Sequence, residues 1–267
     1  MILCHLLALQ TIAFHPILSY RTHPTIWKKQ MIPTTGTGMT FHNFQLDNNI
    51  PKSILHSTSS NINDNPPKPK VVIFDLDGCL WSPEMYELLY FYGGNGAPFS
   101  VHPSDPLQLV TCANQPVKLL GSVRHVMREL HCDPYWNGVK VGISSKTDEP
   151  QWAQELLETF RISTNPNEER NTDEGPNSFA LIDVLQNDII EMIQEPKIHH
   201  FQRIAKVCNV SMEDIVFFDN EFGNCQSVAS LGVTVGYCPN PNGVTFEIWN
   251  AVKESFPQTD GTVIEKY

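Results

Sequence analysis

Residues 70–81 read Lys-Val-Val-Ile-Phe-Asp-Leu-Asp-Gly-Cys-Leu-Trp, and the organisation of the remaining chain follows from them. The run from Val71 to Phe74 is apolar and mostly β-branched, which predicts a short strand buried on both faces. Asp75 and Asp77 come directly after it, at the end of a strand where α/β proteins place their ligands. Such a pair can simply cap a strand end. The motifs further along the chain favour a functional site instead.

The composition suits one sizeable α/β domain with extensions, since 41% of the 267 residues are hydrophobic and 18% are charged. A formal net charge of -11 argues against a non-specific nucleic-acid binder, which would normally be basic. It also gives no support to an anionic membrane surface as a partner. The seven cysteines are odd in number and form no C-x-x-C pair, so they predict neither a disulfide framework nor a zinc site.

Residues 1–69 lack the pattern of a folded domain. The stretch from Met1 to Leu18 is apolar, but it is too short and too interrupted for a stable membrane span. No Asp or Glu precedes Asp47, which is typical of a targeting presequence, and Ala13 to Pro16 resembles the cleavage region of bipartite plastid presequences. We expect residues 1–69 to form a disordered or targeting extension and linker, which as a targeting segment would direct the protein to a plastid or another organelle. The alternative is an unprocessed N-terminus on a cytoplasmic protein.

Residues 82–115 are rich in aromatic side chains and glycine, and they are too few to bury a core of their own. Their position directly after the two aspartates predicts a small flap over a site, or else an ordinary surface loop. An amphipathic pattern over 116–131 then predicts a helix.

Alternating apolar runs and helical patterns follow. Further buried strands are predicted at 139–143, 215–218 and 233–237, with helices at about 150–160, 199–208 and 221–231. The remaining segments predict a polar loop at 163–178, a helix at the centre of 179–194 and a loosely ordered tail at 251–267. This order predicts an α/β fold, a doubly wound parallel sheet with helices on both faces, in one domain over 70–250.

Polar side chains suited to phosphoryl transfer follow three of the predicted strands. They are Asp75 and Asp77, Ser145 and Lys146, and Asp219 and Asn220, with Lys197 at the start of an intervening helix. We expect them to form one site because the carboxyl ends of parallel strands meet at one edge of a sheet. A carboxylate can attack phosphorus, and a second can protonate the leaving oxygen and then activate water. Carboxylates and an amide suit Mg²⁺, and a hydroxyl and an ammonium can hold the transferring oxygens.

These motifs resemble those of the haloacid dehalogenase (HAD) superfamily of phosphatases, and most closely the eukaryotic magnesium-dependent phosphatase family. The resemblance covers about residues 70–245 and rests on F-D-L-D-x-x-L-W at 74–81, S-K-T at 145–147, K-I-x-H-F at 197–201 and F-F-D-N-E at 217–221. It implies a HAD-like, Rossmann-type fold with a small flap rather than a large cap domain. It also implies Mg²⁺ as cofactor and a phosphorylated small molecule or phosphoprotein as substrate, either phosphotyrosine-type protein phosphates or sugar phosphates, including fructosamine phosphates.

The resemblance also implies a role for each motif residue. Asp75 would be the nucleophile, and Asp77 the general acid/base whose backbone carbonyl ligates Mg²⁺. Ser145, Lys146 and Lys197 would hold the phosphoryl group, with Lys197 also balancing the charge of Asp75. The remaining roles concern the metal site, which Asp75 and Asp77 would share with Asp219 and Asn220. In the related small carboxy-terminal-domain phosphatases the Asn of this pair is the direct ligand.

Three positions depart from the family pattern. The family usually has an aromatic residue where Gly78 stands, Arg where Lys146 stands and Asp where Asn220 stands. Lysine offers a point charge rather than a bidentate grip, and the loss of a negative charge weakens Mg²⁺ binding. These changes bear on substrate choice and metal affinity more than on the reaction.

Other readings of the motifs remain. A dehalogenase needs no metal and no acid at position 77, so Asp77 argues against it. A phosphomutase normally needs a larger cap than 82–115 to exclude water. A catalytically silent phosphate-binding or interaction protein would keep the same residues without turnover.

Overall fold

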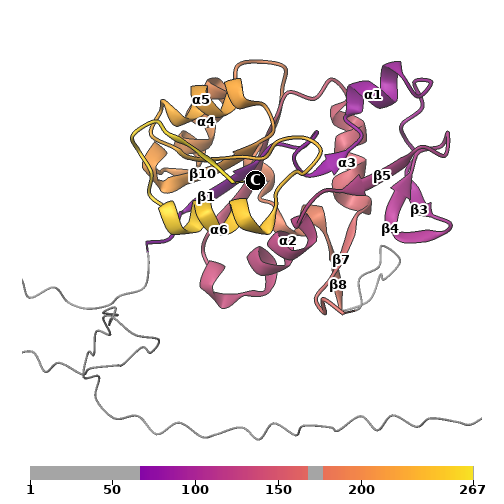
Figure 1. Ribbon diagram of the computed structural model, residues 1–267, viewed down its shortest axis with the longest axis horizontal. Helices are drawn as coiled ribbons and strands as arrows, with labels where there is room; N and C mark the ends of the chain where they lie inside the picture. The colour runs from indigo at the N-terminus through magenta and orange to yellow at the C-terminus, as the bar shows by residue number, and fades with distance from the viewer. Residues whose placement is uncertain (1–66, 168–176, 267) are drawn as a thin grey trace, which may run out of the picture. The chain divides into compact units, whose positions relative to one another are not determined.

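The computed structural model describes residues 67–167 and 177–266, which form an α/β domain around a parallel sheet (Figure 1). The sheet has six strands in the order β12-β11-β10-β1-β6-β9, and every neighbouring pair is parallel. Its strands are β1 (Val71–Phe74), β6 (Lys140–Ser145), β9 (Ile190–Met192), β10 (Ile215–Asp219), β11 (Thr234–Tyr237) and β12 (Val263–Glu265). The strand order changes direction beside β1, so the doubly wound parallel sheet is confirmed, with its switch point at β1.

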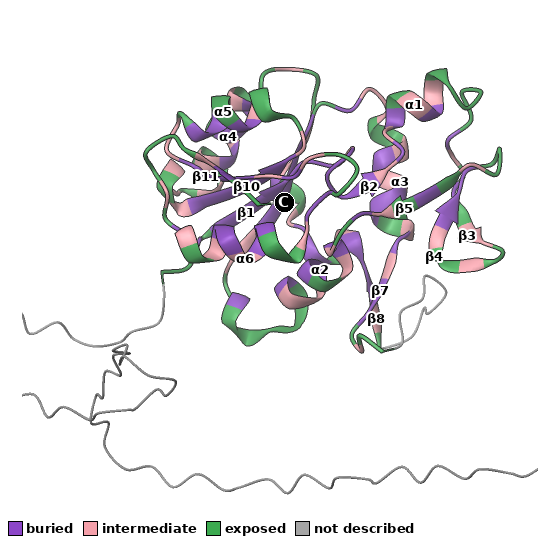
Figure 2. Ribbon diagram, viewed as in Figure 1, coloured by how far each residue is buried: buried purple, intermediate pink, exposed green. Residues whose placement is uncertain are grey.

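Side chains of β1 enter two separate cores because successive residues of a strand point to opposite faces. Val72 and Phe74 belong to the core covered by α2 (Val123–Cys132), α3 (Pro150–Thr159) and α6 (Phe246–Ser255). Val71 and Ile73 belong to the core under α4 (Lys197–Cys208) and α5 (Phe222–Ala229). All four residues of β1 are fully buried, as Figure 2 shows for the centre of the sheet. The predicted burial of this strand on both faces is confirmed.

The segment predicted as a flap at 82–115 is part of a longer segment, residues 81–119, which has regular secondary structure. These residues form a four-stranded antiparallel sheet in the order β2-β5-β4-β3, together with a short helix, α1. The elements are β2 (Trp81–Ser82), α1 (Met85–Tyr90), β3 (Ser100–His102), β4 (Asp105–Val110) and β5 (Pro116–Leu119). Apart from Val110, their buried apolar side chains join the main core, so the segment has no core of its own.

The helix predicted over 116–131 begins only at Val123, because the first part of this segment is β5. Val117 is buried and Lys118 is exposed, which is the alternation of a strand. Gly121, with a φ of +48°, separates the strand from the helix. The apolar pair that follows Lys118 fits both periods, so the pattern alone placed the helix too early.

The prediction of a helix at the centre of 179–194 is wrong. The segment contains β8 (Ser178–Ala180), two turns of 3-10 helix and β9, and β8 pairs with β7 (Arg161–Ser163). The Asp183 carboxylate accepts a hydrogen bond from the Ala180 amide at 2.8 Å and fixes the first of these turns. A short apolar run does not distinguish a buried strand from a buried helix.

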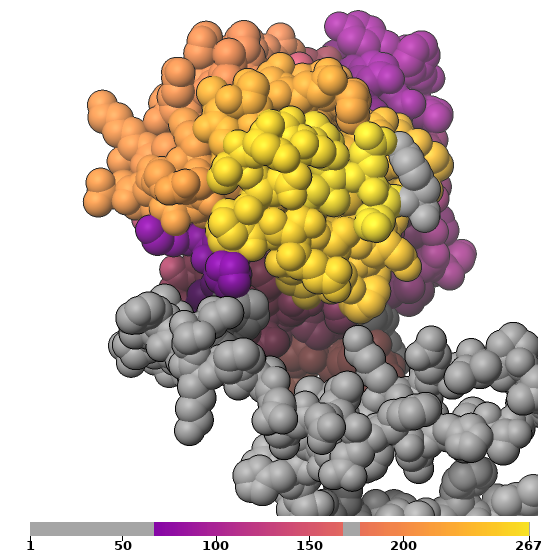
Figure 3. Space-filling model, turned by 60° about the vertical axis from the view of Figure 1, so that its left-hand side comes forward, coloured from indigo at the N-terminus to yellow at the C-terminus, as the bar shows by residue number. Residues whose placement is uncertain are grey.

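The prediction of a loosely ordered tail at 251–267 is also wrong for the residues described. The helix α6 continues to Ser255, and β12 pairs with β11 at the edge of the central sheet. Figure 3 shows the C-terminal segment, in yellow, lying against the domain rather than extending from it. The domain therefore extends beyond the predicted boundary at 250.

Two predicted segments fall largely outside the described residues. The extension and linker at 1–69 overlaps the description only from residue 67, and the centre of the polar loop at 163–178 lies in the undescribed residues 168–176. Within the described ranges, no helix has the length and apolar character needed to cross a membrane.

Candidate active site

The carboxyl ends of β1, β6 and β10 meet at a pocket with a volume of about 250 Å³. Every residue predicted for the site lines this pocket except Asp219. The lining residues are Asp75, Asp77, Glu84, Tyr86, Ser145, Lys146, Thr147, Asp148, Gln194, Lys197, Asn220, Glu221 and Asn224. The structure therefore brings the three strand ends and the start of α4 together, as the sequence predicts.

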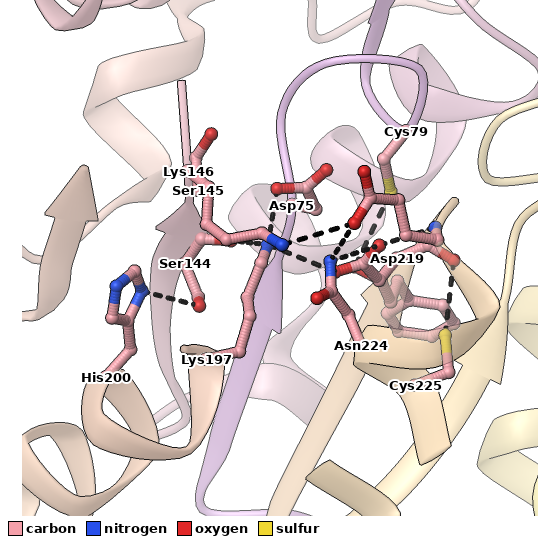
Figure 4. A network of polar contacts seen from close by, with 12 residues as sticks. Asp75, Cys79, Ser144, Ser145, Lys146, Lys197, His200, Asp219, Asn224 and Cys225 are labelled. Carbon is pink, nitrogen blue, oxygen red and sulfur yellow. Dashed lines mark hydrogen bonds and ion pairs between the residues drawn. The ribbon is translucent and has the colours of Figure 1, made fainter. Parts of the chain in front are cut away.

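Lys197 is the buried cation at the centre of the site (Figure 4). Its Nζ lies 2.5 Å from Asp75 Oδ1 and 3.0 Å from Asp219 Oδ2, and it also donates to the carbonyl oxygen of Ser144. Burial alone would lower the pKa of this ammonium, but the two carboxylates outweigh burial and raise the pKa above its usual value. Lys197 therefore carries a permanent positive charge beside Asp75.

The positive charge of Lys197 balances the negative charge of the Asp75 carboxylate only in part. Burial raises its pKa to about 8, with further contributions from the negative charges of Asp219 and Asp77, while Lys197 opposes the rise. A buried carboxylate in this condition gains most from a second cation. Its free oxygen, Oδ2, is the one that faces Asn220.

One terminal atom of the Asn220 side-chain amide lies close to two oxygen atoms of the site. That atom lies 3.1 Å from the carbonyl oxygen of Asp77 and 3.2 Å from Asp75 Oδ2. With nitrogen in this place, the amide donates to both oxygens. With oxygen in this place, the Asn220 amide oxygen, the Asp77 carbonyl oxygen and Asp75 Oδ2 come together with no hydrogen bond between them. The two distances from the amide oxygen are close to the roughly 3 Å that separates neighbouring oxygen ligands around Mg²⁺.

This oxygen set fits a hard divalent cation by its chemistry, since it combines a carboxylate, a backbone carbonyl and an amide oxygen. Only one of its three oxygens belongs to a charged side chain, and the described residues contain no cluster of three His, Cys, Asp or Glu side chains able to hold a metal. Asp75, Asp77 and Asn220 are therefore the residues that would hold Mg²⁺.

A tight turn after β1 places Asp77. The amide of Leu80 donates to the Leu76 carbonyl at 2.7 Å, and Gly78 adopts a φ of +70°. The turn directs the Asp77 carbonyl toward Asn220. The Asp77 carboxylate, whose Oδ1 accepts a hydrogen bond from Trp81 Nε1 at 2.7 Å, lines the pocket.

Burial raises the pKa of Asp77 to about 6, while hydrogen bonds from Trp81 and its neighbours hold the pKa down. A carboxyl group with a pKa near 6 can donate a proton close to neutral pH and take one up again. It therefore has the acid–base range that the predicted role of this residue requires.

Asp219 lies behind Lys197 rather than at the pocket. Its Oδ1 accepts a hydrogen bond from the Glu221 amide at 2.7 Å, and its Oδ2 accepts from Asn224 Nδ2 at 3.2 Å and from Lys197 at 3.0 Å. The residue is fully buried. Of the predicted pair at the end of β10, Asn220 thus faces the oxygen set and Asp219 anchors the lysine.

Ser145 and Lys146 occupy the end of β6. The buried Ser145 hydroxyl oxygen accepts a hydrogen bond from the Thr147 amide at 3.2 Å. Lys146 Nζ lies 3.3 Å from Glu221 Oε2, and that carboxylate oxygen also accepts from Asn224 Nδ2 at 2.8 Å. The charge of Lys146 is therefore partly used by the protein itself.

Sequence reasoning missed several lining residues. Glu84 and Tyr86 belong to the segment predicted as a flap. That prediction placed the segment over the site but gave neither side chain a role. Glu221 was part of a quoted motif without a role. Asn224 lies in the first turn of α5, after the strand-end pair, and no local pattern indicates it. Burial and the charge of Asp77 raise the pKa of Glu84 to about 7, so the flap adds an acid to the rim.

Comparison with known proteins identifies the class. The acid phosphatase family matches residues 67–258. Human magnesium-dependent phosphatase 1 is 26% identical over 172 residues, which cover 64% of this chain and 79% of that protein. A HAD-like hydrolase superfamily protein of Schizosaccharomyces pombe is 25% identical over 167 residues, covering 62% of this chain and 83% of that protein.

Among solved structures, the N-terminal part of BF1531 from Bacteroides fragilis, which contains a phosphatase domain complexed with Mg, has a TM-score of 0.43 and 16% identity. The match covers 73% of this chain and 42% of that chain. The family match over residues 67–258 makes this protein a phosphatase, the class that the resemblance predicts. The chain belongs to the acid phosphatase family.

Proposed function

We propose that this phosphatase is a Mg²⁺-dependent phosphomonoester hydrolase that works through an aspartyl-phosphate on Asp75. The observation that carries the proposal is that the two oxygens of the Asp75 carboxylate have different neighbours. One oxygen contacts the ammonium of Lys197, and the other faces the Asp77 carbonyl and Asn220. Bound Mg²⁺ would supply positive charge that lets an anionic nucleophile and an anionic substrate approach one another. The names of a human relative and of a bacterial structure, each mentioning magnesium, support the choice of metal.

The chain's own residues account for both halves of the reaction. An Asp75 carboxylate oxygen forms a bond to phosphorus while the bond from phosphorus to the leaving oxygen breaks, and Asp77 gives its proton to that oxygen. Asp77 then takes a proton from water as the water oxygen attacks the phosphoryl group, which releases phosphate and restores Asp75. Ser145 and Lys197 hold the phosphoryl oxygens throughout.

We propose a phosphotyrosine-type protein phosphate or a sugar phosphate as substrate. The rim of the pocket supports a ring-bearing leaving group, because Tyr86 lines it and remains 42% exposed. The Phe91 ring packs edge-on against Tyr86 at 6.2 Å between centroids and supports it from outside. An aryl ring or a sugar can lie against such a surface.

The proposal is tested by phosphate release from p-nitrophenyl phosphate, phosphotyrosine peptides and sugar phosphates, with and without Mg²⁺. We expect Mg²⁺-dependent release by the wild type and loss of at least about 10³-fold in kcat in Asp75→Asn, because the amide is no nucleophile. Asp188→Asn is the matched control, since Asp188 is an exposed acid before the amino end of β9. Binding of phosphate without any turnover would instead favour a silent phosphate-binding protein.

We also propose that residues 1–69 direct the protein to a plastid or another organelle, on the basis of their apolar start and lack of acidic residues. A fluorescent fusion of residues 1–69 tests this in the native cell. Diffuse cytosolic fluorescence would contradict it and favour a cytoplasmic protein.

A further inference from the structure

His200 is a buried histidine whose two ring nitrogens both have partners inside the protein. It lies on α4, one turn after Lys197, and is fully buried. Its Nδ1 lies 3.0 Å from Ser144 Oγ, and its Nε2 lies 3.1 Å from the carbonyl oxygen of Ile193. Figure 4 shows the ring turned toward Ser144, beside Lys197. None of the catalytic roles assigned above uses this ring.

The network sets the protonation of the ring. A carbonyl oxygen only accepts hydrogen bonds, so Nε2 carries the proton and donates to Ile193. Nδ1 of the neutral ring is then an acceptor, and the Ser144 hydroxyl donates to it. Both hydrogen bonds of His200 therefore run in a fixed direction.

The charges around the ring favour this neutral form. Burial lowers the pKa of His200, and the positive charges of Lys197 and Arg203 on the same helix lower it further. Glu191 on β9 and Glu195 in the segment before α4 act in the opposite direction. Arg203 forms ion pairs with both of these carboxylates, which weakens their effect on the pKa of the imidazole.

The two partners of His200 connect it to the groups around the phosphoryl site. The carbonyl oxygen of Ser144 accepts a hydrogen bond from Lys197, and the Ile193 amide donates to the Ser145 carbonyl at 3.1 Å. The ring therefore joins the end of β6, the segment after β9 and the first turn of α4. Two of these elements carry the hydroxyl and the ammonium that would hold the phosphoryl group.

We propose that His200 is a positioning residue for phosphoryl transfer, acting through Ser144 and Ile193 to hold Lys197 and Ser145 in place against Asp75. It touches neither the substrate nor the reacting atoms. The inference rests on the proposed roles of Lys197 and Asp75. Its consequence is that loss of the ring lowers turnover more than it weakens substrate binding.

The test compares kcat and KM for p-nitrophenyl phosphate hydrolysis with Mg²⁺ in three variants. We expect His200→Ala to lower kcat about 10- to 100-fold, as loss of an outer partner typically does, with KM changed less than about threefold. The His200→Asn amide can take the place of Nδ1 and bind Ser144, so it recovers most of kcat. The longer His200→Gln side chain takes the place of Nε2 and recovers less, because Ser144 directly holds Lys197.

His199→Ala is the matched control, because His199 is the neighbouring residue on the same helix with a side chain that is 51% exposed. We expect it to keep wild-type kcat. Ser144→Ala should lower kcat as well. The double variant Ser144→Ala/His200→Ala should lose no more than His200→Ala alone, since the Ser144 hydroxyl acts through its contact with His200. Thermal unfolding of each variant shows which of them are folded at the assay temperature.

Three outcomes would overturn the positioning role. They are wild-type kcat in folded His200→Ala, equal kcat in the Asn and Gln variants, and additive losses in the Ser144 double variant. If His200→Ala does not fold, the comparison of Asn with Gln and the Ser144→Ala variant decide. A wild type without Mg²⁺-dependent turnover would contradict the proposed function, whereas an active wild type with unaffected His200 variants contradicts only this inference.

Discussion

Gly78 and Asn220, two of the three departures from the family pattern, meet in space. A Cβ atom at position 78 would lie 2.3 Å from the Asn220 side-chain nitrogen and 3.0 Å from Glu84 Oε1. The backbone at Gly78 also has a φ of +70°, which side chains other than glycine rarely adopt. The glycine therefore leaves room for the amide that completes the oxygen set, and the aromatic residue usual in the family would need another arrangement.

We predict that Gly78→Ala impairs Mg²⁺ use more than stability. The new methyl group must displace Asn220, so the Mg²⁺ concentration for half-maximal activity should rise about tenfold or more. Gly138→Ala is the matched control, since Gly138 has a φ of +83° and open space around its Cβ position. Both variants carry about 1–2 kcal/mol of backbone strain. Equal Mg²⁺ titrations for the two variants would contradict the role of Gly78.

At the scale of elements, α1 places one of its two tyrosine rings at the pocket and the other away from it. Tyr86 lines the pocket, whereas Tyr90, on the same helix, is 71% exposed and does not. We predict that Tyr86→Ala raises KM for aryl phosphates about two- to tenfold with kcat unchanged, which corresponds to one aromatic contact. Tyr90→Ala should leave both constants unchanged in the same steady-state assay. A similar KM for both variants would mean that the ring does not contact the substrate.

Glu129 joins α2 to α6 beneath the sheet. Its carboxylate accepts hydrogen bonds from Trp249 Nε1 at 2.9 Å, Lys253 Nζ at 2.9 Å and Trp136 Nε1 at 3.1 Å. Burial alone would raise the pKa of Glu129, but these donors outweigh burial and hold the pKa below its usual value of 4.5. The ionised form therefore stabilises the folded state above pH 4.5, and this contribution is lost as the pH falls through the lowered pKa.

We predict that Glu129→Gln lowers the free energy of unfolding by about 1–3 kcal/mol at pH 7, because buried donors lose a charged acceptor. The difference from wild type should shrink as the pH falls below 4.5. Glu254→Gln is the control, since Glu254 is an exposed acid on α6. Urea unfolding at several pH values measures both. A difference that stays constant with pH would show that the charge of Glu129 is not the cause.

Element length explains which strands could be predicted. β1, β6 and β10 contain continuous buried runs of four residues or more, β11 contains a run of three, and the sequence indicates all four strands. β9 and β12 have three residues each, too few for a period, and they exist because the neighbouring strand offers free backbone groups. β5 was hidden for a different reason, since its apolar residues merge with the helical pattern of α2.

At the scale of the whole molecule, the family match and the pocket lie in the same part of the chain. The match spans 67–258, and every residue that lines the pocket lies between Asp75 and Asn224. We predict that a chain shortened to residues 67–267 keeps kcat and KM within about twofold of the full chain. Steady-state kinetics on the two purified proteins measure this. A folded but inactive short chain would show that residues 1–66 contribute to the site.

The sequence by itself determined the kind of sheet, the family and which polar side chains stand at the strand ends. Buried strands need uninterrupted apolar residues, and phosphoryl transfer needs carboxylates, a lysine and a hydroxyl at strand ends, so both leave local patterns around Asp75, Ser145 and Lys197.

Only the tertiary structure decided which of these residues face one another. Asp219 and Asn220 are neighbours in sequence, yet one anchors Lys197 and the other meets Asp75, because the chain leaves the strand between them. Glu221 pairs with Lys146 across 75 residues of chain. Such contacts depend on how strand ends and helix starts pack against each other in three dimensions, and no local pattern carries that information.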